Sequence, residues 1–410
     1  MMSTVNLTPA SRADEPAMPL FRPEHAALRD SARAFVEREI VPNVESWERD
    51  EFFPRDLFTS AGAAGFLGLK FDAEVEGSGP DLLAQAVWVE ELARSLSGGV
   101  AADLGASTDL AAVYIDRAGT ADQRAALLPP LLRGERLGSL AITEPDAGSD
   151  VAAITTRARR DGDGWRLDGT KVFITGAARA DDIVVAAKVS ADDGAPSDDP
   201  HGQITLFHVR ADDDGVSRRR LPMLGWRTSF TGELTFQEVR LDDDRRLGEV
   251  GSGFAHITGA FAWERLAMSL GAVAAAERTL ELGIAHARDR EAFGRPIATF
   301  QVWRHRFADL HTRIRTARAL TYQALRLVVA QADGDPDLDA ARVVRTVGMA
   351  KLLTQRLAFD VADECVQVHG GAGYMMEYPV QRAWRDSRLG PIGGGTDQIM
   401  KEIIAKTYGV

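Results

Sequence analysis

The hydrophobic pattern of this chain changes its period twice, and this change limits the folds that the chain can adopt. Apolar residues recur at steps of three and four from Phe21 to about Arg136, alternate from about Leu137 to Leu247, and return to steps of three and four from Gly251 to the end. The first period is that of an amphipathic helix and the second that of a half-buried strand. The sequence therefore predicts an α+β fold that is mostly α, with helices, then strands, then helices.

The same two changes predict the domains. We expect an N-terminal α-helical domain over 21–136, a middle antiparallel β domain over 137–247, and a C-terminal α-helical domain, a four-helix bundle, over 248–410. Short strands with no helices between them favour a small sandwich or barrel over a doubly wound sheet. Residues 1–20 are expected to form a disordered tail.

Local signals predict several element ends. Thr120 and Gln123 have the spacing of a capping box and begin an apolar run that ends at Pro129-Pro130, while Pro42 is expected to end the first helix. The stretch Asp161-Gly162-Asp163-Gly164 predicts a tight hairpin. The clearest strands are 171–175, 182–187, 203–209 and 233–239, and the last helices are 252–289, 299–331, 338–369 and 396–407.

Composition restricts the ligands. The net charge is −12 and the sequence pI is near 5.3, so no nucleic-acid partner is expected, because phosphate backbones need a basic face. An anionic ligand would need local arginines. The single cysteine, Cys365, excludes an intramolecular disulfide and a cysteine-rich metal site, and we expect no metal.

Targeting signals are not found either. The first residues lack the basic start and apolar core of a signal peptide, and they contain acids that a mitochondrial transit peptide avoids. No run approaches the roughly 18 apolar residues of a membrane helix. We therefore expect a cytoplasmic protein with no membrane partner.

Four segments carry residues suited to a planar ring and to phosphates. Residues 142–150, ITEPDAGSD, offer a Gly-Ser turn, and residues 171–176, KVFITG, offer an aromatic ring and a hydroxyl at alternate positions of a strand. Residues 290–301, REAFGRPIATFQ, begin with an arginine that can pair with a pyrophosphate, and residues 367–374, QVHGGAGY, contain a Gly-Gly step that permits close approach. Each segment alone is equally typical of a surface turn, a core strand, a solvated helix residue or a helix C-cap.

In this order and spacing, the four segments resemble the acyl-CoA dehydrogenase family from about Phe21 to the C-terminus. The resemblance includes Gln301 seven residues beyond Gly294, the pair Arg385-Asp386 and the closing segment GGTDQIMKEIIA. It implies a helical domain, a small β domain and a four-helix domain, which is the order predicted from the periodicity. It also implies an FAD enzyme that oxidises an acyl-CoA thioester between its α and β carbons to the trans-2-enoyl-CoA.

The resemblance implies two groups of FAD-binding residues. The group at the isoalloxazine ring is Ile142, Thr143, Gly148, Ser149, Phe173 and Thr175. The group at the adenosine and pyrophosphate half is Arg290, Phe293 and Gln301, with Gln367, Gly370 and Gly371 supplied by a neighbouring subunit and Thr396 and Gln398 completing it. Because this binding mode spans two subunits, a homodimer or a homotetramer (a dimer of dimers) is implied.

The catalytic base is the main departure from the common family pattern. Taking the α proton needs a base while the β hydrogen leaves as hydride, and many members carry a glutamate in a Tyr-Glu-Gly-Thr motif where this chain has Gly394. The isovaleryl-CoA and long-chain members instead carry the base in a Glu-Arg pair, here Glu264-Arg265. A carboxylate on this mostly apolar helix is costly without a function, so Glu264 is the predicted base. The alternative is that Glu264 only pairs with Arg265 or a neighbouring chain.

Substrate contacts are implied by the same resemblance. The Gly394 N–H would polarise the thioester carbonyl, and the small residues at 393 and 394 predict free volume beside the reacting carbons. That volume predicts a branched or medium-chain acyl-CoA. Ser229-Phe230-Thr231 stands where relatives commonly have Ser-Asp-Thr, which leaves local CoA contacts open. The substrate-binding candidates are Ser149, Arg265, Gly393 and Gly395.

Several alternatives stay open on this fold. An electron-transfer flavoprotein is the implied electron acceptor, but a flavin oxidase or monooxygenase is possible, since the sequence does not reveal oxygen access. A thioester on an acyl carrier protein is possible in place of CoA. A non-catalytic flavin-binding protein is disfavoured, because it would not need the carboxylate of Glu264.

Overall fold

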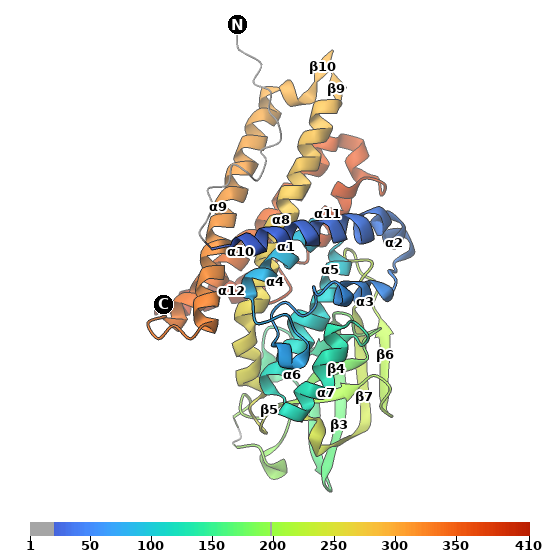
Figure 1. Cartoon of the computed structure of the whole chain (residues 1–410), viewed down its shortest axis with the longest axis vertical. Coiled ribbons are helices and arrows are strands. Elements are labelled where there is room, and N and C mark those ends of the chain that lie inside the picture. The colour runs from blue at the N-terminus through green and yellow to red at the C-terminus, as the bar shows by residue number, and fades with distance from the viewer. Residues whose placement is uncertain (1–19, 197–198) are drawn as a thin grey trace.

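A computed structural model of the chain describes residues 20–196 and 199–410. Helices form the first part, strands the middle and helices the last, so the predicted α+β, mostly α, fold is confirmed (Figure 1). The predicted disordered tail, 1–20, lies outside the described residues except for Leu20. Within the described residues, none of the helices combines the length and the apolarity that a membrane crossing requires. The domain boundaries stay predictions.

The N-terminal helices pack around large aromatic side chains. Trp88 stacks on Phe66 with ring centroids 4.5 Å apart, and Phe35 meets Trp88 edge-on at 5.8 Å. All three rings are buried, and such rings supply much of the apolar area that stabilises a small core. The helices are α1 (Pro23–Phe35), α2 (Val44–Asp50), α3 (Asp56–Ala63), α4 (Leu82–Ala93), α5 (Gly98–Gly105), α6 (Ala112–Ala118) and α7 (Ala121–Leu132).

Pro42 does not end the first helical stretch, contrary to the expectation. A π-helical turn, Val36–Ile40, and a 3-10 turn, Val41–Asn43, lead directly from α1 into α2. A proline ring normally clashes with the carbonyl four residues earlier. Here the wider π turn, closed by the Val41 N–H on the Val36 carbonyl, changes that spacing locally.

The start of α7 was predicted correctly and its end was not. Gln123 N donates to Thr120 Oγ1 at 3.2 Å, and Thr120 N donates to Gln123 Oε1 at 2.8 Å, so the capping box is confirmed. Pro129 and Pro130 lie inside the helix. The helix continues past them because the Pro129 carbonyl still accepts a hydrogen bond from Arg133 N, at 2.9 Å.

The described strands of the middle part form one twisted sheet. Its order is β6-β7-β3-β2-β4-β5-β8, with β1 beside β4. Most pairs are antiparallel, as predicted, but β4 pairs in parallel with β1 and β2. The predicted hairpin joins β2 to β3, with Gly162 in the left-handed region at φ +65°. The strands are β1 (Gly138–Ala141), β2 (Arg157–Asp161), β3 (Gly164–Ile174), β4 (Asp182–Lys188), β5 (Ile204–Arg210), β6 (Val216–Arg220), β7 (Gly232–Asp242) and β8 (Arg246–Leu247).

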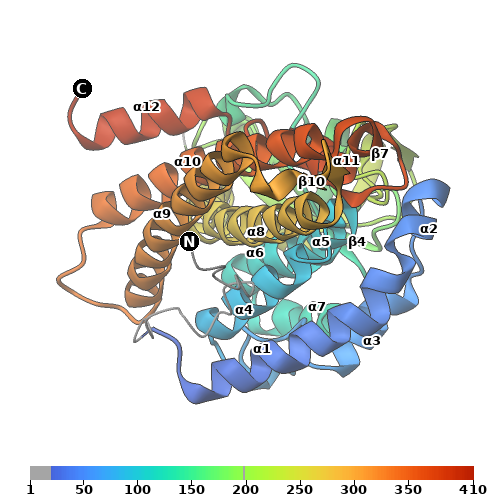
Figure 2. The same ribbon diagram turned by 90° about the horizontal axis from the view of Figure 1, so that it is seen from above.

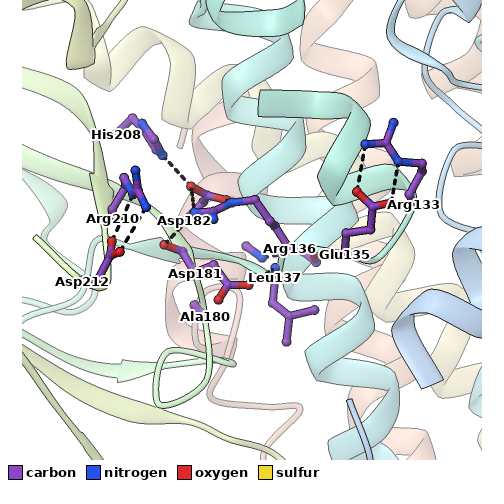
Figure 3. Close-up of polar contacts among 12 residues, drawn as sticks. Arg133, Glu135, Arg136, Leu137, Ala180, Asp181, Asp182, His208, Arg210 and Asp212 are labelled. Carbon is purple, nitrogen blue, oxygen red and sulfur yellow. Dashed lines mark hydrogen bonds and ion pairs between the residues drawn. The ribbon is translucent and has the colours of Figure 1, made fainter. Parts of the chain in front are cut away.

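A charge network joins the last N-terminal helix to the sheet (Figure 3). Arg136 donates to both carboxylate oxygens of Asp182, at 2.6 and 2.8 Å, and Asp182 Oδ1 lies 2.8 Å from Nε2 of His208. Leu137 N donates to Asp181 Oδ2 at 2.8 Å. Burial alone would raise the pKa of Asp182, but His208 and Arg136 outweigh it and lower that pKa. The network therefore fixes the chain where the hydrophobic period changes.

The C-terminal part is a bundle around one long helix, α8, at the centre of Figure 2. With 37 residues, α8 extends about 55 Å, and α9, α10 and α4 pack along it. The four helices predicted here are found with ends within two residues of the prediction, whereas α11 and a small hairpin were not predicted. The elements are α8 (Gly253–Asp289), β9 (Glu291–Ala292), β10 (Arg295–Pro296), α9 (Gln301–Ala332), α10 (Ala340–His369), α11 (Pro379–Ser387) and α12 (Asp397–Thr407).

Candidate active site

Glu264 lies in the first half of α8 with its side chain half-buried. Within the described residues its carboxylate receives no hydrogen bond and forms no ion pair. Burial raises the pKa of Glu264, and the positive charges of Arg265 and Lys351 oppose this only in part, while Asp109 adds to it. A carboxyl group in such surroundings is suited to taking up a proton.

Gly394 lies directly opposite this carboxylate. A Cβ built on Gly394 would lie 3.7 Å from Glu264 Oε1. The carboxylate on α8 therefore reaches the space where a side chain at 394 would begin. Gly394 has φ +61°, a conformation that is natural for glycine and strained for other residues. The two family positions for a base thus converge on one point in this chain.

Arg265 does not pair with Glu264. Its Nε donates to the Gly394 carbonyl at 3.2 Å, and its guanidinium lies over the Phe261 ring at 4.4 Å from the centroid. Of the two alternatives for Glu264, an ion pair with Arg265 is not found in the described residues, and a pair with a neighbouring chain stays open. Arg265 holds the glycine turn in place, and its expected contact with CoA stays a prediction.

Lys351 of α10 is buried, and its side chain holds the turn that contains Gly394. Its Nζ donates to the carbonyls of Gly390, at 2.9 Å, and Gly395, at 2.5 Å. Burial lowers the pKa of Lys351 to about 8. At the far side of the turn, the Thr396 hydroxyl caps α12 by accepting from Ile399 N at 3.2 Å. The sequence reasoning missed Lys351, whose signal is a charged residue on the apolar face of a helix.

The segment 142–150 leaves the end of β1 and is fixed by a buried ion pair between Lys171 and Glu144. Lys171 Nζ lies 2.8 Å from Glu144 Oε1 and donates to the Ile142 carbonyl at 2.8 Å. Glu144 also accepts from Thr155 N at 2.6 Å and Thr156 N at 2.9 Å. Burial alone would raise the pKa of Glu144, but Lys171 and these hydrogen bonds lower it to about 2.

The groups predicted to meet the isoalloxazine ring are left accessible by this arrangement. Gly148 and Ser149 are exposed, and a Cβ built on Gly148 meets nothing within 4 Å. Val172 N donates to the Thr143 carbonyl at 2.9 Å, so the 142–150 turn and β3 lie side by side. Ile142 packs on the same apolar cluster as Phe261 of α8. The turn therefore adjoins the half of α8 that carries Glu264.

Phe173 is unusual in two respects. Its side chain is 69% exposed and its φ is +60°, which is strained for an aromatic residue and often marks a functional position. A bulge between Lys171 and Ile174 interrupts the pairing of β3 with β7, and Thr175 lies in the turn after the strand. Simple alternation therefore cannot place Phe173 and Thr175 on one face. An exposed ring, an open Gly-Ser turn and a half-buried hydroxyl nevertheless fit the flat ring of FAD.

The second group of predicted cofactor residues lies at the opposite end of α8. Arg290 is the C-cap residue of α8, and the adjoining β9–β10 hairpin forms the outer tip of the bundle (Figure 1). His286 and His369 stack at 4.0 Å, which brings the end of α10 to the same place. Six of the eight residues of this group lie here, and all six are exposed: Arg290, Phe293, Gln301, Gln367, Gly370 and Gly371.

In one chain the base and Arg290 lie far apart along α8. Arg290 follows Glu264 by 26 residues of helix, which is about 39 Å along the axis. Thr396 and Gln398, predicted to complete the adenosine and pyrophosphate half, lie beside the Gly394 turn instead. In a single chain, Thr396 and Gln398 therefore lie at the end of the site that contains Glu264.

The departure at 229–231 has a structural explanation. Ser229 Oγ donates to Asp103 Oδ1 at 2.6 Å, and Phe230 N donates to Asp103 Oδ2 at 3.0 Å. The Phe230 ring lies between the guanidinium groups of Arg179, at 3.9 Å, and Arg220, at 4.5 Å. Phe230 thus holds the β part against the N-terminal helices.

The geometry defines a class of protein. A helical frame around a β sheet presents an exposed aromatic ring, an open Gly-Ser turn and a carboxylate with a raised pKa. This combination is that of a flavin-dependent oxidoreductase that removes a proton from its substrate.

Comparison with known proteins identifies the family. Sequence models of the acyl-CoA dehydrogenase N-terminal, middle and C-terminal domains match residues 22–135, 139–239 and 251–409. The chain is 37% identical over 388 residues to the mitochondrial long-chain specific acyl-CoA dehydrogenase of Rattus norvegicus, covering 94% of this chain and 87% of that protein. The chain belongs to the acyl-CoA dehydrogenase family.

Solved structures agree with this assignment. A probable acyl-CoA dehydrogenase from Mycobacterium abscessus is 39% identical with a TM-score of 0.88, over 95% of this chain and 100% of that chain. Butyryl-CoA dehydrogenase from Megasphaera elsdenii is 30% identical with a TM-score of 0.86, over 95% and 99%. The protein is an FAD-dependent acyl-CoA dehydrogenase, and an electron-transfer flavoprotein partner is consistent with its family.

Proposed function

We propose that this dehydrogenase uses Glu264 as its base and acts on unbranched medium- or long-chain acyl-CoA. The observation that carries the first part is the position of the Glu264 carboxylate. It is half-buried, accepts no hydrogen bond within the described residues, and lies 3.7 Å from the position that the Cβ of a side chain at 394 would take.

The residues divide the reaction between them. Glu264 takes the α proton of the thioester, and its raised pKa makes it a stronger base than an ordinary carboxylate once it is ionised. The N–H of Gly394 polarises the thioester carbonyl. Arg265 and Lys351 hold the turn that carries this N–H. Phe173 and the 142–149 turn would hold FAD, which would supply the acceptor for the hydride that leaves the β carbon.

The chain preference rests on what fills the space near Gly394. The free volume expected there from the sequence is not present, because a Cβ on Gly394 would overlap the Sδ of Met268. Gly393 is more open, with only Leu389 near its Cβ position, at 3.9 Å. The relatives named long-chain specific favour a long chain, and the filled space beside Gly394 favours an unbranched one. Branched acyl-CoA is the alternative.

We also propose that the cofactor bridges two subunits of a homotetramer and that electrons pass to an electron-transfer flavoprotein. The distance of about 39 Å between Glu264 and Arg290 along α8 supports the bridging. The cytoplasmic location stays a prediction.

Anaerobic titration of the FAD-loaded protein tests the substrate class. Butyryl-, octanoyl-, palmitoyl- and isovaleryl-CoA are added in turn, and bleaching of the flavin absorbance is followed. Octanoyl- or palmitoyl-CoA is expected to bleach fastest, and a clear optimum on isovaleryl-CoA would contradict the proposal. Admission of air distinguishes the oxidase alternative, since a dehydrogenase is expected to reoxidise slowly until an electron-transfer flavoprotein is added.

A further inference from the structure

We infer that Met268 is a specificity-determining residue of this enzyme, which closes the acyl pocket beside the base and excludes branched chains; this rests on the proposed function. Glu264 and Met268 are four residues apart on α8. Side chains with this spacing lie one above the other on the same helix face. The base and the thioether therefore point toward the same region.

The contact with Gly394 places Met268 at the reacting carbons. A Cβ built on Gly394 would overlap Met268 Sδ and lie 3.5 Å from its Cε, and the same Cβ would lie 3.7 Å from Glu264 Oε1. The thioether thus fills the volume that a side chain at 394 would need. Because Glu264 must touch the α carbon to take its proton, the substrate meets Met268 at its α and β carbons.

The backbone of Met268 is held firmly while its side chain can adapt. Gln355 Nε2 donates to the Met268 carbonyl at 2.8 Å, and Gln355 is itself buried against Gly390. This links α8 to α10 and to the turn that Lys351 clamps. The unbranched thioether then acts as a soft apolar wall. It accommodates a methylene chain, and it conflicts with an extra methyl on the α or β carbon.

Three variants separate this role from a general effect on folding. Met268→Ala removes the wall, Met268→Leu conserves most of its volume, and Met223→Ala is a matched methionine substitution in the middle part of the chain. For each FAD-loaded variant, kcat/KM is measured on isobutyryl-, isovaleryl-, butyryl- and octanoyl-CoA with one electron acceptor. The quantity of interest is the branched-to-linear ratio.

The ratio is expected to rise about tenfold or more in Met268→Ala, because one methyl group in a fitted pocket changes selectivity by roughly that factor. The α-branched isobutyryl-CoA should gain most. Met268→Leu and Met223→Ala should keep the wild-type ratio. An unchanged ratio in Met268→Ala, with octanoyl-CoA activity and FAD content retained, would overturn the inference.

A binding measurement keeps this test independent of turnover. In a Glu264→Gln background, where proton abstraction is blocked, the dissociation constants of isobutyryl- and butyryl-CoA are read from the perturbation of the flavin spectrum. Adding Met268→Ala should tighten isobutyryl-CoA relative to butyryl-CoA, and no change would contradict the wall. If the wild type binds acyl-CoA without reducing its flavin, the proposed function fails while this comparison still decides the role of Met268.

Discussion

At the scale of single residues, the surroundings of two carboxylates, those of Glu264 and Glu144, give them different pKa values and different roles in the site. Glu264 is half-buried and Glu144 is buried, yet burial raises the pKa of Glu264 while Lys171 and hydrogen bonds lower that of Glu144 to about 2. The first can take up a proton, and the second stays ionised and holds a turn. A partner within hydrogen-bond distance decides between these two roles.

The raised pKa of Glu264 predicts a pH dependence. Because the base must be ionised to accept the α proton, flavin reduction is expected to fall as the pH drops through a pKa above that of an ordinary glutamate. Asp109, which accepts from Trp263 Nε1 at 2.8 Å and pairs with Lys70, adds to this rise. Asp109→Asn should therefore move the rising limb of the stopped-flow rate to lower pH.

Asp50→Asn is the control, because Asp50 is exposed. It should leave the pH at which the stopped-flow rate rises unchanged. Arg265, Lys351, Tyr114 and Asp109 are the charged or titratable groups that interact with Glu264. A limb that moves to higher pH in Asp109→Asn would mean that another group controls the rate.

At the scale of elements, the structure explains which parts the sequence could predict. The helices α8, α9 and α10 have long and regular apolar periods, and their ends were predicted closely. The nine-residue α11 was missed because it is short and mostly polar, and it buries polar side chains, among them Arg382 and Asp386. The π turn before Pro42 and the bulge at Phe173 are backbone irregularities that no period reveals.

The site was predictable only in part for a related reason. Glu264 was chosen as the candidate base because a family motif and an apolar helix both singled it out. Lys351 and Lys171 hold the turns beside the site, and the only sequence signal for Lys351 was a charged residue on the apolar face of a helix. Met268 is typical of a core residue, and only its position against Gly394 gives it a role.

The Lys171–Glu144 pair predicts an effect on β3 and the 142–149 turn. Lys171→Met should leave the carboxylate of Glu144 buried without its partner, which costs about 3–5 kcal/mol. We expect a lower thermal midpoint together with weaker FAD retention, measured by differential scanning fluorimetry and by the flavin content after gel filtration. Lys188→Met, at the half-buried end of β4, is the control.

The Lys171–Glu144 pair also predicts how the stability of the protein changes in acid. Because the pKa of Glu144 in the folded state, about 2, lies below its unfolded value, its contribution is present above the unfolded pKa and is lost as the pH falls toward 2. The difference between wild type and Lys171→Met should therefore shrink in acid. A difference that is unchanged down to pH 2 would contradict the ion-pair explanation.

At the scale of the whole molecule, the length of α8 separates the base from the second group of cofactor residues. The β9–β10 hairpin projects from the outer end of the bundle (Figure 1), with Phe293 96% exposed. Such a large exposed ring is expected to be covered by a neighbouring subunit. Cofactor binding and assembly are therefore expected to depend on each other.

Arg290→Ala tests this dependence. Loss of a charged hydrogen bond to the cofactor is worth about 1.5–3 kcal/mol, so FAD should dissociate roughly ten- to a hundredfold more readily. The oligomer should weaken with it, as followed by light scattering at several protein concentrations. Arg288→Ala in the preceding turn is the comparison variant, and a stable tetramer with stoichiometric FAD in Arg290→Ala would rule out the bridging role.

The most direct test of the central claim is the anaerobic single-turnover rate of flavin reduction in Glu264→Gln. The amide conserves the shape of the side chain but cannot take the α proton, so the variant should bind FAD and octanoyl-CoA while the rate falls roughly 10²–10⁴-fold. Bound acyl-CoA is checked in the same experiment from the shift of the flavin spectrum before reduction. A variant that binds both and reduces its flavin at nearly the wild-type rate would show that Glu264 is not the base.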